Sequence, residues 1–458
     1  VYGLANEALG HYTDAKDGFD IATLDPATRS AAYTCLARLS LKQDDPARAK
    51  GYAEKAMVNN ALNMEALQLQ AVCARLSDRN APPPVNSNRN VLPPVNPNRN
   101  ALPPVNPNRP GNKDILALID SLDPLNHFSR FERYLADPGP SNKQAFLSLI
   151  RNELPHETFL ELGIWYYNCG LTNEALQVFR LSPPNAEVSL WIARLTGTPV
   201  DWSAIDPVRA FPFRSETGAL LEERLKTDNH WFLKYQLAYI YRDRNRLDDC
   251  KRLLLSCADT PGYAPFYVFR AQTMPEDSQC LHDLLHARSM DPGWRYQKLL
   301  TEYYIRNKDY PRALAVIEAY CRSHPDHNTM GLLYARTLVL NHQWQEADRL
   351  LAQLQVLPAE GSTSAHDIYR EVKLMEAVGK IKRKEYKKAR ALIADARQWP
   401  ENLGSGAPYP ADQDTRLEDY LGSLCREIAA SPASAPAPPE PATPIEHRVL
   451  QALTGAGY

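Results

Sequence analysis

The segment CLHDLLHA carries the side chains best suited to bind a metal ion. His282 and His286 are four residues apart, a spacing that puts both imidazoles on one face of a helix. With Cys280 beside them, they offer the nitrogen and sulfur ligands that zinc prefers. No glutamate follows the first histidine, so the metalloprotease motif is absent, and no third ligand is evident. We therefore interpret all three as ordinary helix residues and predict neither a metal nor a cofactor.

The motifs of common nucleotide-binding and hydrolytic sites are missing from the sequence. It contains no G-x-x-x-x-G-K-[ST] phosphate loop, no G-x-G-x-x-G after a predicted strand and no G-x-S-x-G nucleophile turn. Acidic residues are plentiful, but without predicted strands or a predicted pocket no two of them can be assigned as acid and base. We predict that this chain is not itself an enzyme.

Segments rich in aromatic residues, proline and arginine are the best candidates for binding. They are FPFR (211–214), APFYVFR (264–270), PAEGSTSAHDIYR (358–370) and WPENLGSGAPY (399–409). Arginine and aromatic side chains are enriched at binding faces. The candidate binding residues are Arg214, Phe266, Tyr267, Arg270, Arg295, Arg370, Trp399 and Asn402. The alternative is that these segments only pack between helices and cap helix starts.

Composition and charge exclude several classes of partner. The 458 residues are 44% hydrophobic, enough for a large core, and carry a net charge of −2. Binding to nucleic acid or to an anionic membrane needs clustered positive charge, and the basic run KIKRKEYKK is interpreted as a solvated helix face. No run of 18 apolar residues is present, so we predict no membrane span. Eight cysteines without a C-x-x-C pair favour a reducing compartment, and we predict a cytoplasmic protein.

Small residues that recur about 34 positions apart indicate the elements that must position these side chains. Ala313 and Ala347 are 34 residues apart, and each is followed four residues later by a large aliphatic residue, Ile317 or Leu351. A period in this range with helix–turn–helix content is typical of tetratricopeptide repeats, which stack helix pairs around a concave binding face.

The clearest repeat is ETFLELGIWYYNCGLTNEALQVF. Gly163 and Ala175 are the small residues that allow two helices to approach closely, and Tyr166 and Phe179 fill the space around them. Gly170 makes the turn between the helices. In weaker copies the small residue is Ala37, Ala49, Ala238, Cys250, Cys280, Ala335, Ala377 or Ala389.

Two insertions interrupt the period. NAPPPVNSNR, NVLPPVNPNR and NALPPVNPNR follow one another in the turn of one repeat, where proline excludes helix and central strand. We interpret this tract as an extended or disordered spacer, with a ligand for a proline-binding partner as the alternative. The distance from Ala347 to Ala389 is 42 residues, so about eight residues are inserted around Gly361–His366.

These patterns predict an all-α fold of the tetratricopeptide type: a right-handed superhelix of antiparallel helix pairs. We expect helix pairs over 1–79, a disordered insertion over 80–112, further pairs over 113–428, and a disordered Ala/Pro-rich tail with a short terminal helix over 429–458. The chain begins with Val1 in mid-helix pattern and without methionine, so we expect it to be a fragment.

Several segments resemble a known bacterial family. NELPHETFLELGIWYY, LDPLNHFSRFERYL, FPFRSET, APFYVFRAQ and ARQWPENLGSGAPYPADQDTRLEDYL are similar to the C-terminal half of large tetratricopeptide proteins of Bacteroidetes and Firmicutes. The resemblance covers nearly all of 1–428 outside the decapeptide tract. Those proteins carry an N-terminal β-sandwich domain of unknown function that is similar to sugar-mutarotase and galactosidase sandwiches. The resemblance implies a helical repeat region and a link to carbohydrate utilisation, and it supplies no catalytic residue.

The function predicted from this sequence is that of an interaction or scaffolding region. We expect a protein or peptide partner on the concave face and no nucleic acid or membrane partner. One alternative is the accessory region of a carbohydrate-active enzyme whose β-sandwich lies upstream. The other is an independent sugar-binding module that uses the aromatic and arginine segments.

Overall fold

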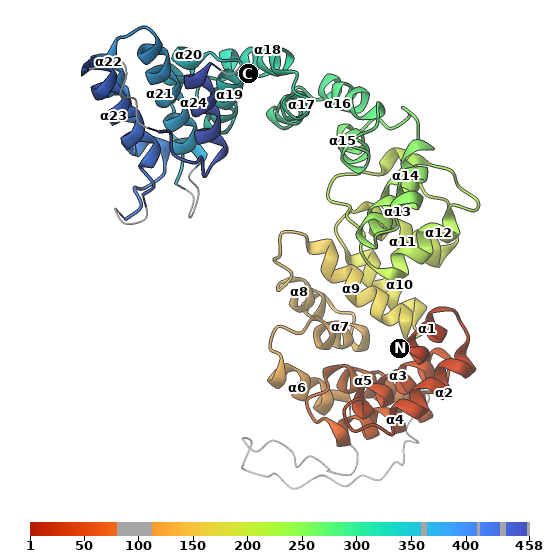
Figure 1. Ribbon diagram of the computed structural model, residues 1–458. Helices are drawn as coiled ribbons and strands as arrows, with labels where there is room; N and C mark the ends of the chain where they lie inside the picture. Colours follow the sequence, from red (N-terminus) through yellow and green to blue (C-terminus); the bar gives the residue numbers. More distant parts are fainter. Residues whose placement is uncertain (80–111, 359–363, 410–412, 431–436, 456–458) are drawn as a thin grey trace, which may run out of the picture. The chain divides into compact units, whose positions relative to one another are not determined.

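The described part of the chain is entirely helical and divides into two compact units. The computed structural model describes residues 1–79, 112–358, 364–409, 413–430 and 437–455, and within these ranges it contains helices and no strands (Figure 1). Unit 1 is Val1–Leu253 and unit 2 is Leu254–Tyr458, and each is described by itself. None of the helices in the described ranges is long and apolar enough to cross a membrane.

Unit 1 begins with four helices and continues through the region of the predicted insertion. Its helices are α1 (Tyr2–Ala8), α2 (Tyr12–Ala22), α3 (Arg29–Lys42), α4 (Pro46–Asn59), α5 (Met64–Arg79), α6 (Asn112–Leu122), α7 (His127–Ala136), α8 (Pro140–Leu147), α9 (Pro155–Asn168), α10 (Thr172–Leu181), α11 (Ala186–Thr196), the short η1 (Trp202–Ala204), α12 (Ser215–Arg224) and α13 (Trp231–Asp243). The boundary between the units lies within α14 (Leu247–Leu255).

Unit 2 contains the rest of the helices. They are α15 (Ala264–Thr273), α16 (Gln279–Met290), α17 (Trp294–Arg306), α18 (Tyr310–Ser323), α19 (Asn328–Leu340), α20 (Trp344–Leu351), α21 (Ser364–Lys382), α22 (Tyr386–Ala396), the short η2 (Glu401–Leu403), α23 (Arg416–Ala430) and α24 (Pro444–Thr454).

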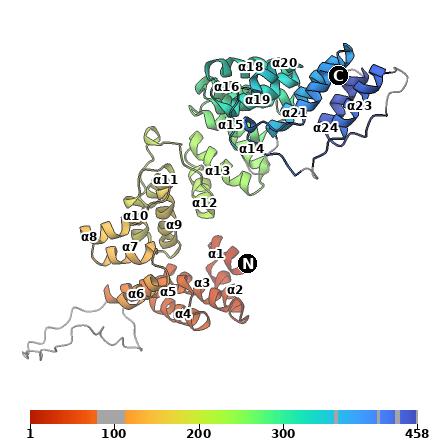
Figure 2. The ribbon, with the colours of Figure 1, turned by 90° about the vertical axis from the view of Figure 1, so that its left-hand side faces the viewer.

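Consecutive helices pack against each other as antiparallel pairs (Figures 1 and 2). In unit 1 these include α3 with α4 and α9 with α10, and in unit 2 they include α15 with α16, α17 with α18 and α21 with α22. The first helices of successive pairs also touch, from α3 through α5 and α7 to α9, and from α17 through α19 to α21. This arrangement is that of tetratricopeptide repeats, and it confirms the predicted fold class.

The small residues stand where two helices cross closely. A β-carbon added to Gly163 on α9 would lie 2.4 Å from a ring carbon of Phe179 on α10, and Ala175 is fully buried beside them. Gly170 has φ +80°, a backbone conformation that side-chain-bearing residues rarely adopt, and it makes the turn between the two helices. The small residues equivalent to Ala175 in the second helices of later pairs are also buried: Cys250, Cys280, Ala313, Ala347 and Ala389. The repeat consensus read from the sequence is therefore confirmed.

A buried ion cluster connects the helices of unit 1. Arg75 on α5 donates to Glu132 on α7 through Nε at 2.7 Å and Nη2 at 3.2 Å, and to Glu174 on α10 through Nη1 at 2.9 Å. Tyr166 on α9 donates its hydroxyl to Glu132 at 2.7 Å. All four side chains are buried. The cluster therefore cross-links four helices through polar groups.

The interruptions of the repeat are only partly described. Helices α5 and α6 pack against each other as one pair, as expected if the decapeptides are inserted between them. The predicted disorder of the insertion, 80–112, falls on residues outside the described ranges except for Asn112, which is the first residue of α6. In the second interruption, residues 361–363 are likewise outside them, and helix α21 begins at Ser364.

The C-terminal tail ends in a helix that is packed. The sequence predicted a short terminal helix after a disordered stretch, and α24 is that helix. It packs against α21 (Figure 2). Residues 431–436 are not described, and residues 437–443 form no helix or strand.

Candidate binding groove of the first unit

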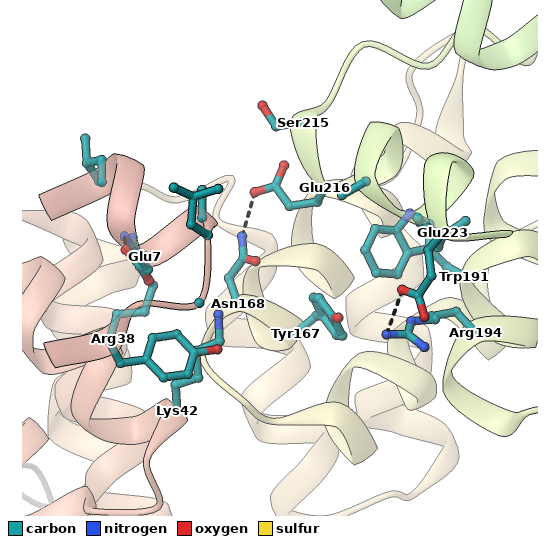
Figure 3. Close-up of a pocket in the computed structure, with 17 residues that line it drawn as sticks. Glu7, Arg38, Lys42, Tyr167, Asn168, Trp191, Arg194, Ser215, Glu216 and Glu223 are labelled. Atoms are coloured by element: carbon teal, nitrogen blue, oxygen red, sulfur yellow. Dashed lines mark hydrogen bonds and ion pairs between the residues drawn. The ribbon is translucent and has the colours of Figure 1, made fainter. Parts of the chain in front are cut away.

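Unit 1 has a groove of about 680 Å³ between its N-terminal helices and helices α9, α11 and α12. Figure 3 shows Glu7, Arg38 and Lys42 on one side, and Trp191, Arg194 and Glu223 on the other. The lining comes from α1, α3, α9, α11 and α12, from the turn after α1 and from the start of α2, and repeat arrays bind partners on concave surfaces formed by several helices.

Most charged groups in the groove are already engaged. Arg38 donates to Glu7 through Nη2 at 3.0 Å and to Glu65 through Nη1 at 2.9 Å. Arg194 and Glu223 form an ion pair of 3.1 Å across the far side. These contacts fix the shape of the groove and leave little unbalanced charge at either end.

Lys42 is the exception. Its Nζ lies 5.3 Å from the ring centre of Tyr12, a cation–π distance, and no carboxylate among the described residues forms an ion pair with it. Lys42 is half-buried and stands at the C-terminal end of α3, beside Gly170 in the turn after α9: a β-carbon on that glycine would lie 2.9 Å from the Cα of Lys42. The close approach of α3 to the turn after α9 therefore places in the wall an ammonium group that has no ion-pair partner among the described residues.

Polar and aromatic groups complete the lining. Asn168 at the end of α9 donates Nδ2 to Glu216 of α12 at 2.8 Å, and Figure 3 shows this contact in the middle of the groove. Tyr167 packs edge-on against Trp191, with ring centres 5.0 Å apart. Trp191 is 1% exposed, so the groove offers the rings of Tyr12 and Tyr167, an amide and an ammonium group within one concave site, a mixture suited to a peptide.

A second hollow of about 930 Å³ continues from the first. It shares Leu9, Arg194 and Glu223 with the groove and extends over the exposed end of α12 to Lys226 and Thr227. An extended segment longer than a few residues therefore has a continuous surface to follow within unit 1.

The residues predicted from sequence do not line this groove. Arg214 is the only one of the eight in unit 1, and its Nη1 donates to Glu157 at 2.7 Å while its guanidinium lies 4.3 Å from the ring centre of Phe213. Phe213 itself is exposed. Arg214 thus ties the loop before α12 to the first turn of α9.

Three predicted residues lie in the interior of unit 2. Phe266 and Tyr267 are fully buried and Arg270 is 1% exposed. The hydroxyl of Tyr267 donates to the carbonyl of Pro261 at 2.9 Å. Their side chains have almost no surface to offer a partner, and their observed role is packing, the alternative left open by the sequence.

The other four are separated from one another along unit 2. Arg295 is exposed over the ring of Trp294 at 4.6 Å, and Trp399 stacks on His366 with ring centres 3.4 Å apart. Asn402 donates Nδ2 to the carbonyls of Leu351 and Leu354 at 3.0 and 2.9 Å. Arg370 forms ion pairs with Glu418 of α23 and Glu446 of α24. Their binding roles stay predictions, and no single site gathers them.

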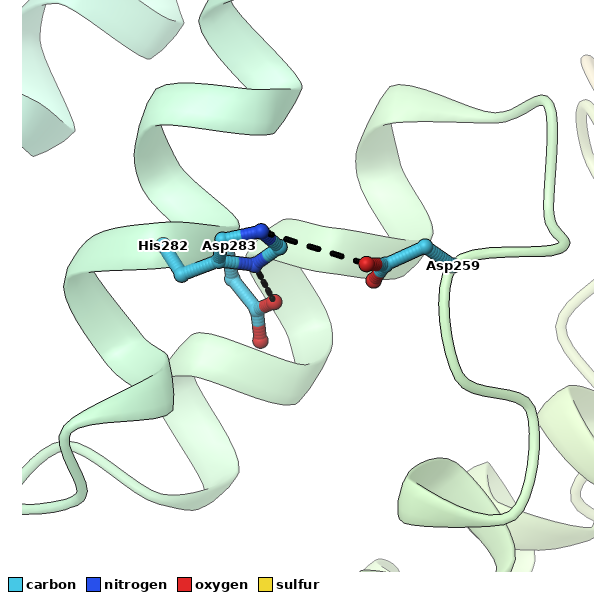
Figure 4. A group of neighbouring side chains, drawn as sticks. All are labelled: Asp259, His282 and Asp283. Atoms are coloured by element: carbon cyan, nitrogen blue, oxygen red, sulfur yellow. Dashed lines mark ion pairs between the residues drawn. The ribbon is translucent and has the colours of Figure 1, made fainter.

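A cluster in unit 2 has the ligand types of a metal site. Carboxylate or imidazole atoms of Asp259, His282 and Asp283 lie within 4.8 Å of one another (Figure 4). However, Arg270 donates to Asp283 through Nε at 2.9 Å and Nη2 at 2.7 Å, and Nη2 is also 3.0 Å from Asp259. A guanidinium already neutralises both carboxylates, and a divalent cation would have to enter beside it. The cluster is therefore interpreted as a buried ion pair between α15 and α16.

A smaller hollow of about 230 Å³ lies at the start of α7. The Nδ1 atom of His127 and the Nε1 atom of Trp165 are buried there without a hydrogen-bond partner among the described residues. One ordered water commonly satisfies such atoms. The hollow therefore carries no functional conclusion.

Sequence reasoning missed the groove because its residues belong to the repeat rather than to the unusual segments between repeats. Lys42 and Asn168 both lie in the last turn of a first helix, directly before the turn of the pair. That shared position is the signal that could have found them. A search for polar residues at equivalent positions in successive repeats would have singled out both.

Comparison with known proteins adds little to this geometry. No protein-family model and no curated protein matches the sequence. A solved tetratricopeptide repeat protein from Parabacteroides merdae is similar over 59% of this chain and 99% of its own, with 10% identity and a TM-score of 0.29. Yeast Tom70 is similar over 94% of this chain and 97% of its own, with 12% identity and a TM-score of 0.27. At such scores neither structure bears on the site, and the fold assignment stands on the helix pairs themselves.

Proposed function

We propose that this chain is a protein-interaction region whose unit 1 binds a segment of a partner protein in the groove between α1, α3, α9 and α12. The observation that carries the proposal is Lys42, a half-buried ammonium group with no ion-pair partner among the described residues, in the wall of a groove of about 680 Å³. An ammonium group in the wall of a groove, without an ion-pair partner of its own, can pair with a carboxylate of a ligand without breaking an existing ion pair.

The rest of the groove suits recognition better than catalysis. Its other charged groups are held in ion pairs or in the hydrogen bond between Asn168 and Glu216. Groups held in this way are poorly placed to transfer protons to a substrate, whereas the partly exposed rings of Tyr12 and Tyr167 beside a cation fit an apolar side chain next to an acidic residue. The proposed ligand is therefore an acidic–apolar segment of a protein.

Selection from a displayed peptide library on the full chain tests this assignment. We expect the enriched peptides to carry Asp or Glu beside a large apolar residue. Lys42→Glu should weaken their binding at least tenfold, which corresponds to about 1.4 kcal/mol. Because no described carboxylate pairs with Lys42, the substitution should leave the melting temperature nearly unchanged.

Lys143→Glu is the matched control. It makes the same charge change at an exposed position of α8 in the same unit, outside the groove. Equal losses with Lys42→Glu and Lys143→Glu would show that binding follows overall charge only, and enrichment of peptides without acidic residues would contradict the proposed ligand.

We further propose, on the resemblance of the quoted motifs, that the array belongs to a larger protein with an N-terminal β-sandwich domain. The coding sequence that precedes the codon for Val1 tests this proposal. An upstream sequence without such a domain would refute it and would leave the groove assignment untouched.

A further inference from the structure

Helix α24 has its own start and stop signals. The Thr443 hydroxyl accepts from the backbone N–H of Glu446 at 3.2 Å, and the Glu446 carboxylate accepts from the N–H of Ala442 at 2.7 Å, which is a variant of the capping box. Pro444 occupies the first turn, and Gly455 ends the helix with φ +77°. With 11 residues the helix is too short to be stable alone in water, so it depends on the surface that it covers.

The surface under α24 contains a buried carboxylate, that of Glu371 on α21. Arg448 of α24 donates to this carboxylate through both Nε and Nη2 at 2.6 Å. Arg336 of α19 donates to the same group at 3.0 Å. Glu371 is 1% exposed, so the bidentate contact from α24 is made at a nearly dry site, where such contacts are strongest.

A second charged point has the opposite sign. Arg370 of α21 donates to Glu418 of α23 through Nε at 2.5 Å and Nη2 at 3.0 Å. Its Nη2 also lies 3.6 Å from the carboxylate of Glu446 on α24. The surface under α24 therefore carries a carboxylate, that of Glu371, and a guanidinium, that of Arg370. Helix α24 places Arg448 against the first and Glu446 near the second.

Apolar contact completes the fit. Val449 is fully buried in a cluster with Leu374 of α21 and with Leu417 and Leu421 of α23, and Ile445, Leu450 and Leu453 of α24 pack around it. An amphipathic helix that lays one apolar face into a groove between other helices is a recurring way in which helical segments are bound.

The position of α24 is that of a ligand rather than of a repeat. Helix α21 already has its pair partner in α22, and α23 follows α22, so α24 adds to the first helix of a completed pair. Its connection to α23 is the Pro- and Ala-rich residues 431–443, of which the described part, 437–443, forms no helix or strand.

We propose that the surface formed by α19, α21 and α23 is a helix-binding site, that α24 is its occupant in cis, and that an amphipathic helix of a partner protein displaces it. The partner helix carries the pattern that α24 displays: an acidic residue for Arg370, an arginine two residues later for Glu371, and an apolar residue directly after the arginine. This site is independent of the groove in unit 1.

The linker between α23 and α24 determines how tightly a partner helix must bind to replace α24. A short linker gives its segment an effective concentration on the order of millimolar. A partner helix present at micromolar concentration must therefore bind about a thousandfold more tightly than α24 itself, or act when α24 is weakened. Helix α24 thus makes the site selective by excluding weak helical ligands.

The experiment measures binding of a fluorescent synthetic peptide, Ala442–Gly455, to the full chain by anisotropy. Arg448→Glu in the chain places a carboxylate against Glu371, so α24 should leave and the wild-type peptide should bind at least tenfold more tightly than to the wild-type chain. A peptide with the Arg448→Glu change should bind neither chain. Arg426→Glu, a charge reversal at an exposed position of α23, should leave peptide binding as in the wild type.

Hydrogen exchange on the wild-type chain gives a second readout that does not depend on the variant folding. The amides of α24 should exchange at least tenfold faster than those of α21, and excess unlabelled peptide should speed them further. Equal protection of α24 and α21, or equally weak peptide binding by the wild-type and Arg448→Glu chains, would overturn the proposal. A wild-type dimer that Arg448→Glu dissociates would overturn the cis assignment in favour of exchange between two copies.

Discussion

The two units treat the surface of their first helices differently. In unit 1 the surface beside α3 and α9 is an open groove with an unpaired lysine. In unit 2 the surface of α21 is covered by α24, and its Glu371 accepts from Arg448 of that helix. The same repeat architecture thus leaves one such surface open and has one covered by a helix of the chain itself.

The units also place their buried ion clusters differently. In unit 1, Arg75 joins helices that all belong to the array. In unit 2, Glu371 accepts from Arg336 within the array and from Arg448 on the tethered helix. A buried ion pair contributes little net stability compared with apolar packing, but removal of one partner is strongly unfavourable. Within an array this cost favours the one arrangement of helices that pairs the charges. At a surface that binds a helix, the same cost favours a helix that carries the complementary charge.

The largest expected difference between the units is in the stability lost when one arginine of each ion cluster is replaced by methionine. Arg75→Met removes the bidentate cation of Glu132, which is 0% exposed, and we expect it to lower the free energy of unfolding of unit 1 by about 3–5 kcal/mol. Arg448→Met should release α24 with a much smaller effect on the rest of unit 2, because Glu371 keeps Arg336. Urea unfolding, with hydrogen exchange to localise the change, measures both.

The control for this prediction removes the whole cluster. Arg75→Met combined with Glu132→Leu, Glu174→Leu and Tyr166→Phe replaces the polar cluster by apolar side chains and should recover most of the lost stability. A loss below about 1 kcal/mol for Arg75→Met alone would mean that solvent reaches the cluster and that the two units do not differ in this way.

A second expected difference concerns pH. In unit 1, burial raises the pKa of Glu187 to about 7 from an ordinary 4.5, the neighbouring charge of Glu157 adds to the rise, and the hydrogen bond from Thr217 opposes it. A carboxyl with a raised pKa stabilises the fold below pH 4.5 and loses that contribution as the pH rises to 7, here by about 3 kcal/mol. Glu187→Gln, which stays neutral, should therefore be more stable than the wild type at pH 8 and equal to it at pH 4.5.

Chemical unfolding at these two pH values checks the effect. Glu54→Gln removes a carboxyl at an exposed position of α4 and should change stability equally little at both. A Glu187→Gln variant that loses stability at pH 8 would show that the ionised carboxylate is favourable in the folded chain, contrary to the stated cause.

Unit 2 should respond to pH in the opposite direction. Burial against Trp399 lowers the pKa of His366 from its ordinary 6.5, although Asp367 and the carbonyl of Gln398 partly offset the shift. A histidine with a lowered pKa stabilises the fold above pH 6.5 and loses that contribution as the pH falls through the lowered value. Melting of the wild type and of His366→Gln at pH 5 and pH 8 tests this, and the effect should be smaller than at Glu187 because of the offsetting groups. A wild type no more sensitive to acid than the variant would contradict it.

The sequence predicted the helix pairs but neither the ion clusters nor the groove. Gly163 and Phe179 lie in one repeat, so their spacing along the chain specifies their contact. Arg75 and Glu174 are 99 residues apart, and Glu371 and Arg448 are 77 residues apart. The helical period gives the face on which each side chain lies, but the helix that comes opposite is set by packing of several pairs. The Pro- and Arg-containing segments attracted attention by composition, although Phe266, Tyr267 and Arg270 owe their presence to the core.

The smallest expected effects have opposite signs at two glycines within first helices. Gly163 in unit 1 lies against the ring of Phe179, with 2.4 Å for an added β-carbon, so Gly163→Ala should destabilise the α9–α10 pair by about 1–3 kcal/mol through overpacking. Gly379 in α21 of unit 2 has open space around that position, and Gly379→Ala should stabilise by about 0.5–1 kcal/mol because alanine loses less backbone entropy in a helix. Urea midpoints of the two variants against the wild type measure both changes. Opposite signs would confirm that the glycine of the first unit is required by a helix crossing and that of the second is not, whereas stabilisation by both substitutions would show that the α9–α10 crossing can relax to admit a methyl group.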